Sequence, residues 1–148
     1  MTNPPSVHAS AVKVGDCAVL IRGPSGAGKS RLAFDLILAG RAGQIPPCIL
    51  VGDDRVRLDA GHGQLLVRPM PELAGLIEIR GLGIRRCDFV HEARVRLVAD
   101  LSAPDGERLP PIDALQTEVY GISIPRIPIA ASHNPLPLIV AAMTTTPG

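Results

Sequence analysis

The stretch GPSGAGKS, residues 23–30, constrains the fold more than any other part of the chain. It matches the pattern G-x-x-x-x-G-K-[ST], it follows the apolar run CAVLIR, and it precedes a segment with helical spacing. Glycines in such a loop let backbone N–H groups surround a phosphate, and the start of the following helix adds partial positive charge. The sequence therefore predicts a strand, a phosphate-binding loop and a helix in succession.

The loop predicts a nucleotide or pyrophosphate site and does not reveal the acceptor. Lys29 is expected to reach the terminal phosphates, and the Ser30 hydroxyl is expected to bind Mg²⁺. The residues predicted to contact the phosphates are Gly23, Pro24, Ser25, Gly26, Ala27, Gly28, Lys29 and Ser30.

Composition favours one α/β domain built from short strands. The chain has 148 residues, enough for one hydrophobic core, and aromatic residues make up only 2% of it. Its core must therefore consist of Val, Ile, Leu and Ala, and 15 glycines and 15 prolines predict many turns. We expect mixed short strands with few helices.

The apolar pattern places these elements along the chain. Two hairpins, one main helix and several further strands are expected, with Gly40 ending the helix and Gly81-Leu82-Gly83 forming a sharp turn. The expected strands cover residues 7–13, 17–22, 48–51, 56–60, 64–69, 76–80, 94–101 and 117–127; the expected helices cover 28–39 and 137–144, and 104–111 is expected to be a loop.

Charge and cysteine content exclude several classes of protein. The net charge is +1, with 15 Lys and Arg spread along the chain and almost no aromatic residues to stack on bases, which argues against nucleic acid as a partner. No apolar run approaches the ~20 residues that span a bilayer, so we predict a cytoplasmic protein without a membrane partner. Three cysteines without a C-x-x-C pair argue against a disulfide framework or a zinc site.

Asp53 and Asp54 follow the apolar run CILV, where a carboxylate can meet the phosphate loop at the sheet edge. One carboxylate could bind Mg²⁺ through water and the other could accept a proton from an incoming hydroxyl. Neighbouring side chains of an extended backbone point in opposite directions, so only one of the two is expected to face the substrate. A solvated turn is the alternative, and the preceding phosphate loop favours the functional interpretation.

The roles of four further polar residues are less well determined by the residues alone. Glu78 and Arg80 are expected on one face of a strand. They could be a Mg²⁺ ligand beside a phosphate-binding group, or a surface ion pair. From the residues alone we favour the ion pair. His8 lies on the first expected strand, and Arg108 lies in a polar loop where a solvated side chain is the default.

Four stretches in order resemble one family, the bacterial HPr kinase/phosphorylases. They are SVHASAV, GPSGAGKS, ILVGDDRV and IEIRGLGI, and the last is the most specific because it is no general feature of phosphate loops. The resemblance runs from Val7 to Ile84 and more loosely to Met143. It implies a compact P-loop kinase domain related to the core of phosphoenolpyruvate carboxykinase. Residues 1–148 would be a single catalytic domain, without the family's N-terminal domain.

The resemblance implies an ATP- and Mg²⁺-dependent kinase that phosphorylates a serine of HPr, the phosphocarrier of the phosphotransferase system. Family members also use pyrophosphate, reverse the reaction by phosphorolysis and form hexamers. Asp53 then resembles the base, Ser30 and Glu78 resemble Mg²⁺ ligands supported by Asp54, and Lys29 would stabilise the transferring phosphoryl group. His8 would orient Asp53, and Arg108 resembles a catalytic arginine.

One segment departs from the family pattern I-P-V-R-P-G-R-N, which is tied to phosphorolysis. This chain has IPIAASHN, residues 127–134, with Ala130 and His133 in place of the two arginines. Neither replacement can grip a phosphate in two places as arginine does, so we predict weak or absent phosphorylase activity. Two alternatives to a protein kinase stay open: a small-molecule P-loop kinase, and a non-catalytic ATP-binding module that regulates a partner.

Overall fold

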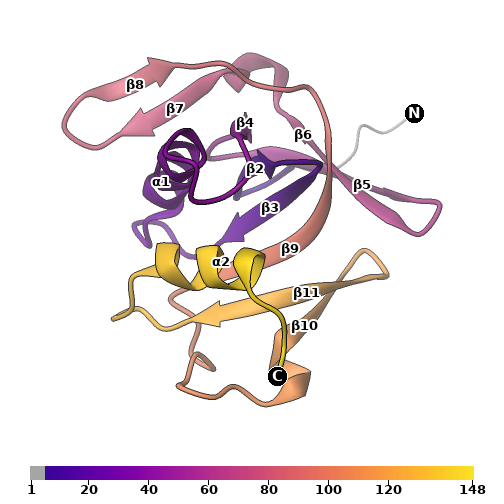
Figure 1. Ribbon diagram of the computed structural model, residues 1–148. Helices are drawn as coiled ribbons and strands as arrows, with labels where there is room; N and C mark the ends of the chain where they lie inside the picture. Colours follow the sequence, from indigo (N-terminus) through magenta and orange to yellow (C-terminus); the bar gives the residue numbers. More distant parts are fainter. Residues whose placement is uncertain (1–5) are drawn as a thin grey trace.

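Strands β3 and β9 form the centre of the structure, a computed structural model that describes residues 6–148. They pair in parallel within a nine-stranded sheet whose main order is β1-β5-β6-β9-β3-β2-β4 (Figure 1). The hairpin of β10 and β11 joins this sheet where β11 runs parallel to β9, and β7 pairs with β8 in a separate two-stranded sheet. The predicted mixed α/β fold is confirmed.

The strands are β1 (Ser6–Val7), β2 (Ser10–Val14), β3 (Cys17–Arg22), β4 (Cys48–Gly52), β5 (Val56–Gly61), β6 (Gln64–Pro69), β7 (Leu76–Ile79), β8 (Gly83–Arg86), β9 (Ala93–Leu101), β10 (Gln116–Val119) and β11 (Ile122–Ile129). The helices are α1 (Lys29–Arg41) and α2 (Pro135–Thr144), with short 3₁₀ turns at Pro71–Leu73 and Ile112–Leu115.

Alternating side chains of the central strands build two apolar cores, one on each face of the sheet. In β3, Val19 and Ile21 pack beneath α1, whereas Ala18 and Leu20 pack on the opposite face. Helix α1 contributes its buried side to the first core, as the sequence predicts: Leu32, Ala33, Leu36 and Ile37. The β5–β6 and β10–β11 hairpins cover the second core. Because the apolar side chains lie on the two faces of the sheet, polar residues can occupy the ends of the strands.

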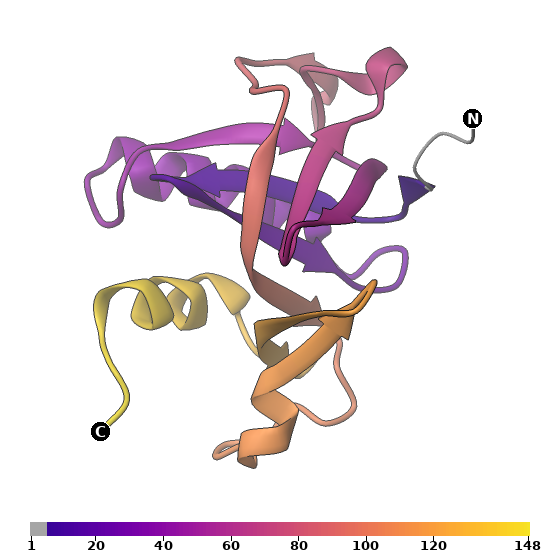
Figure 2. The ribbon, with the colours of Figure 1, turned by 90° about the vertical axis from the view of Figure 1, so that its right-hand side faces the viewer.

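Strand β9 links the upper and lower parts of the molecule. It runs from the side of the β7–β8 hairpin toward the β10–β11 hairpin (Figure 2). On one edge β9 pairs with β3, and on the other it pairs first with β6 at Ala93 and Arg94 and then with β11 from Val98 onward. Strands β6 and β11 therefore pair with different parts of the same edge of β9, and residues 95–97 lie between the two pairings.

Two expected strands are each split in two: residues 7–13 form β1 and β2 with His8 between them, and residues 117–127 form the antiparallel pair β10 and β11. Three further expected boundaries are wrong. Helix α1 continues through Gly40 to Arg41. The glycine permits close packing instead, since a Cβ atom at position 40 would lie 2.8 Å from the Cys48 nitrogen. Helix α2 begins two residues early, since the Asn134 side chain accepts a hydrogen bond from the Leu136 N–H. Strand β7 ends at Ile79, and the turn leads into β8, a strand that the sequence interpretation missed.

The three cysteines are free thiols, as the sequence predicts. Each is half-buried, and Cys48 and Cys87 pack against the core beneath α1. Burial raises the pKa of the Cys48 thiol to about 11 and also raises the pKa of Cys87. Both thiols are therefore neutral near pH 7. Within residues 6–148 no helix is long and apolar enough to cross a membrane.

Candidate functional site

The phosphate loop has the backbone shape that its sequence predicts. Gly26 and Gly28 adopt φ values of 83° and 99°, a region that other residues rarely enter, and a Cβ atom at either position would meet open space. Gly28 precedes the first residue of α1, and no side chain caps that end of the helix. The first backbone N–H groups of α1 are therefore available to a phosphate.

Lys29 folds back over this loop. Its ammonium group donates hydrogen bonds to the carbonyl oxygens of Gly23 and Pro24, at 2.7 Å and 3.1 Å. These contacts hold the charge of Lys29 at the phosphate loop.

Asp53 is the centre of the candidate site. Only 4% of the residue is exposed, and its carboxylate accepts hydrogen bonds from two hydroxyls and one backbone N–H. Ser10 Oγ donates at 2.6 Å, Ser30 Oγ at 2.8 Å and 2.9 Å to the two oxygens, and the Glu78 N–H at 3.0 Å. Strands β2, β4 and β7 and helix α1 thus converge on one carboxylate.

The structure separates the two neighbouring aspartates. Asp53 turns into the protein, whereas Asp54 is exposed and has a φ value of 68°. The expectation that only one of them faces the site therefore agrees with their burial. Ser10, which no sequence motif singles out, is fully buried and makes the shortest contact with Asp53. Ser10 stands two residues after His8, and only the strand pairing shows that it lies beside the Asp53 strand end.

Glu78 and Arg80 do not form the expected surface ion pair in the described part of the chain. Because β7 ends at Ile79, Arg80 lies in the turn that follows, and both side chains are exposed. The Glu78 backbone, however, contacts Asp53 directly. Among residues 6–148 no three His, Cys, Asp or Glu side chains cluster as a ready metal site.

His8 contacts Arg55 and makes no hydrogen bond to Asp53 among the described residues. The Arg55 guanidinium donates to His8 Nε2 at 2.9 Å and to Ser6 Oγ at 3.0 Å. His8 also lines a cavity of about 370 Å³, together with Arg22 and Tyr120. The residues that line this cavity include neither Asp53 nor a residue of the phosphate loop.

Arg108 lies exposed in the segment between β9 and β10, and within residues 6–148 it forms no ion pair. The segment with the altered family pattern contains the end of β11, a turn with a hydrogen bond from the His133 N–H to the Ala130 oxygen, and the cap of α2. His133 is exposed.

An ionic network lies directly before the phosphate loop. Arg22 donates two hydrogen bonds to Asp100, at 2.7 Å and 2.8 Å, and Arg126 donates to the same carboxylate at 2.5 Å. Arg126 also donates two hydrogen bonds to the Asp105 carboxylate, at 2.7 Å and 3.0 Å. Burial alone would raise the pKa of Asp100, but the hydrogen bonds from Arg22 and Arg126 outweigh it and lower that pKa. The network joins β3, β9, β11 and the Arg108 segment.

A family model described as the HPr Serine kinase C-terminal domain matches residues 1–146. The chain belongs to this family. The resemblance in the four sequence stretches is therefore confirmed, and the phosphate loop, Asp53 and the IEIRGLGI segment are parts of a known domain type.

Similar proteins carry the corresponding names. The chain is 35% identical over 95% of its length to an HPr kinase/phosphorylase of Azoarcus sp., and 33% identical over 92% to one of Clostridium beijerinckii. It spans about half the length of these relatives, 47% in both cases. A solved HPr(Ser) kinase/phosphatase from Coxiella burnetii matches with a TM-score of 0.73 and 29% identity, covering 93% of this chain and 92% of that one.

Proposed function

We propose that this chain catalyses Mg²⁺- and ATP-dependent phosphorylation of a serine in an HPr-type phosphocarrier. The contact between Ser30 and Asp53, at 2.8 Å, carries the proposal. This contact joins the hydroxyl after the phosphate-loop lysine to a buried carboxylate at the end of a strand. The similar proteins from Azoarcus sp. and Clostridium beijerinckii are both named HPr kinase/phosphorylase. Phosphoryl transfer needs alignment and charge compensation more than covalent help, and this geometry offers both.

The donor side of the site suits Mg·ATP. The open space around Gly26 and Gly28 leaves room for phosphate oxygens, and Lys29 lies over the loop. Mg²⁺ favours oxygen ligands and commonly uses one or two carboxylates plus the substrate's phosphates. Ser30 would supply one such oxygen; we assign Glu78 as a second ligand and Asp54 as support. We assign Arg80 to binding of the ATP phosphates and Arg108 to stabilisation of the transferring phosphoryl group.

The acceptor side centres on Asp53. Its two oxygens already accept hydrogen bonds from Ser10, Ser30 and the Glu78 N–H, which occupy most of its acceptor positions. If Ser30 turns to Mg²⁺, Asp53 gains an open position for the acceptor hydroxyl. Asp53 would then accept the serine proton, with Ser10 keeping the carboxylate in place. We assign His8, which contacts Arg55, as a positioning residue for Asp53.

The partner is proposed to be a protein, and the chain offers exposed apolar groups for protein contacts. Leu109 and Ile112, beside Arg108, are 78% and 85% exposed, and Leu82 in the β7–β8 turn is 68% exposed. Such side chains suit an interface with an acceptor protein or with further copies of the chain in a hexamer. Cytoplasmic location stays a prediction.

Transfer of radiolabel from γ-labelled ATP to a purified HPr-type protein tests this function. We expect stoichiometric labelling of one serine with Mg²⁺ present, and none with Lys29→Ala, because that variant loses the ammonium group at the phosphates. Labelling of a metabolite instead would indicate a small-molecule kinase. Tight ATP binding without any turnover would indicate a non-catalytic regulatory module.

The altered sequence of segment 127–134 predicts that the reverse reaction, phosphorolysis of seryl-phosphorylated HPr, is much slower than the kinase reaction. Incubating seryl-phosphorylated HPr with the protein and inorganic phosphate should release little pyrophosphate, because Ala130 and His133 cannot grip the attacking phosphate in two places. Pyrophosphate release should rise in the double variant Ala130→Arg/His133→Arg. Rapid release by the unaltered chain would contradict the inference.

A further inference from the structure

The segment 104–115, which leads from β9 to β10 and carries Arg108, is not anchored by the apolar core. None of its residues is buried, and its apolar side chains Leu109 and Ile112 are 78% and 85% exposed. A segment without buried apolar contacts opens locally at little cost in free energy. Its conformation therefore depends on polar contacts with the rest of the chain.

Arg126 supplies such contacts near both ends of the segment. Its guanidinium donates to the Asp105 carboxylate at 2.7 Å and 3.0 Å, and to the Ala114 carbonyl oxygen at 2.9 Å. Within the part of the chain that the structure describes, the bond to Ala114 is the only hydrogen bond that reaches residues 107–115 from outside the segment. Arg108 therefore lies between two points that one side chain holds.

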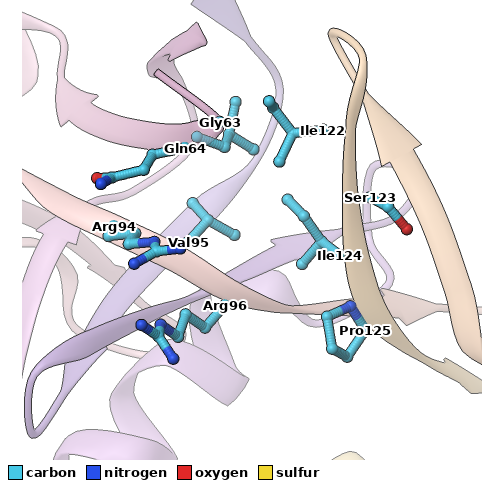
Figure 3. A pocket seen from close by; sticks show the side chains of 10 residues that line it. Gly63, Gln64, Arg94, Val95, Arg96, Ile122, Ser123, Ile124 and Pro125 are labelled. Carbon is cyan, nitrogen blue, oxygen red and sulfur yellow. The ribbon is translucent and has the colours of Figure 1, made fainter. Parts of the chain in front are cut away.

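Arg126 itself stands on a well-packed part of the sheet. It pairs with Val98 in the parallel ladder between β11 and β9, and its side chain is only 14% exposed. Two residues earlier, Ile124 is 2% exposed and points from β11 toward β9 (Figure 3). A functional group on a loop is held most precisely when rigid elements support it. Arg126 can therefore fix the loop relative to the sheet.

The same ionic network reaches the start of the phosphate loop. Arg126 and Arg22 donate to one carboxylate, that of Asp100, and Arg22 directly precedes Gly23. Gly23 lies against the end of β9, since a Cβ atom at this position would be 3.0 Å from the Leu101 Cβ atom. Arg126 thus holds the segment at the strand ends where the phosphate loop begins.

We propose that Arg126 and Asp105 are positioning residues, which anchor the segment 104–115 and thereby hold Arg108 beside the phosphate loop during phosphoryl transfer. This inference rests on the proposed kinase function and on the role assigned there to Arg108. Displacement of a catalytic group by about 1 Å can lower a rate ~10²-fold. The anchor should therefore affect kcat and not the binding of ATP by the phosphate loop.

Asp105→Ala tests the anchor without opening the core, because the Asp105 side chain is 48% exposed. We expect kcat for labelling of an HPr-type protein to fall at least ~10-fold, while the KM for ATP changes less than ~3-fold. Asp59→Ala is the matched control, since Asp59 also pairs with an arginine and is 50% exposed. Its kcat should stay within ~2-fold of that of the unaltered chain.

A double-mutant cycle with Arg108→Ala separates positioning from a general structural effect. If Asp105 acts through Arg108, adding Asp105→Ala to Arg108→Ala should lower kcat less than ~2-fold further, because the positioned group is already absent. Losses that multiply in the double variant would overturn the proposal. So would an unchanged kcat in Asp105→Ala, or an equal loss of kcat in Asp59→Ala.

Amide hydrogen exchange measures the anchor independently of activity. Peptides from residues 104–115 should exchange several-fold faster in Asp105→Ala, and at the rate of the unaltered chain in Asp59→Ala. Unchanged exchange of this segment in Asp105→Ala would overturn the anchor. If the unaltered chain labels no HPr-type protein although the exchange difference is present, the proposed function fails and the anchor stands.

Discussion

Asp53→Asn is expected to lower the rate of serine phosphorylation about 1,000-fold while Mg·ATP affinity changes only a few-fold. General bases contribute factors of ~10²–10⁴, and an amide cannot accept the serine proton. Asn has nearly the same shape, so its oxygen can still accept from Ser10 or from the Glu78 N–H. Labelling kinetics and nucleotide titration of the same preparation separate kcat from binding.

Asp54→Asn is the matched control, because it makes the same chemical change at the exposed neighbour. We expect a much smaller loss of rate in that variant. If Asp53→Asn retains near-normal labelling, Asp53 is not the base. If it instead loses Mg·ATP affinity as strongly as rate, Asp53 serves the metal with Ser30, an arrangement that P-loop enzymes use.

Asp100→Ala is expected to destabilise the fold by about 3 kcal/mol. The substitution leaves two guanidinium groups without their shared carboxylate, at a place where the side chains of Asp100 and Arg126 are only 15% and 14% exposed. Removing one partner of a buried ion pair is costly because the other charge stays desolvated. Urea unfolding at pH 7 measures the effect.

Asp59→Ala provides the comparison on the surface. Asp59 pairs with Arg68 at 3.2 Å, but its side chain is 50% exposed, so water screens the pair and the expected loss is below ~1 kcal/mol. Equal losses in the two variants would show that the Asp100 network contributes no more than a surface pair.

The Asp100 network also predicts how stability depends on pH. The pKa of Asp100 lies below its ordinary value, because the hydrogen bonds from Arg22 and Arg126 outweigh the effect of burial. The pKa of Asp105 is lowered as well, by its hydrogen bonds from Arg126. A carboxyl with a depressed pKa stabilises the fold above its unfolded pKa of ~3.9, and this contribution disappears as the pH falls through the folded pKa. Unfolding curves between pH 5 and pH 2.5 should show a weaker acid dependence in Asp100→Ala.

Local patterns were sufficient to predict the backbone of the phosphate loop and the buried side of the helix that follows it. GPSGAGKS specifies its own backbone because glycine permits the φ values at positions 26 and 28, and the apolar spacing after it specifies the buried side of α1. The order of four short stretches was enough to indicate the family, which the match over residues 1–146 confirms.

The contacts between distant segments were decided only by the tertiary structure. Ser10, Ser30 and the Glu78 backbone converge on Asp53 from separations of 43, 23 and 25 residues, which no short pattern encodes. The same holds for the carboxylate of Asp100, which Arg22 and Arg126 share. Strand pairing and register determine which of these side chains meet, because a shift of one residue turns a side chain to the opposite face of the sheet.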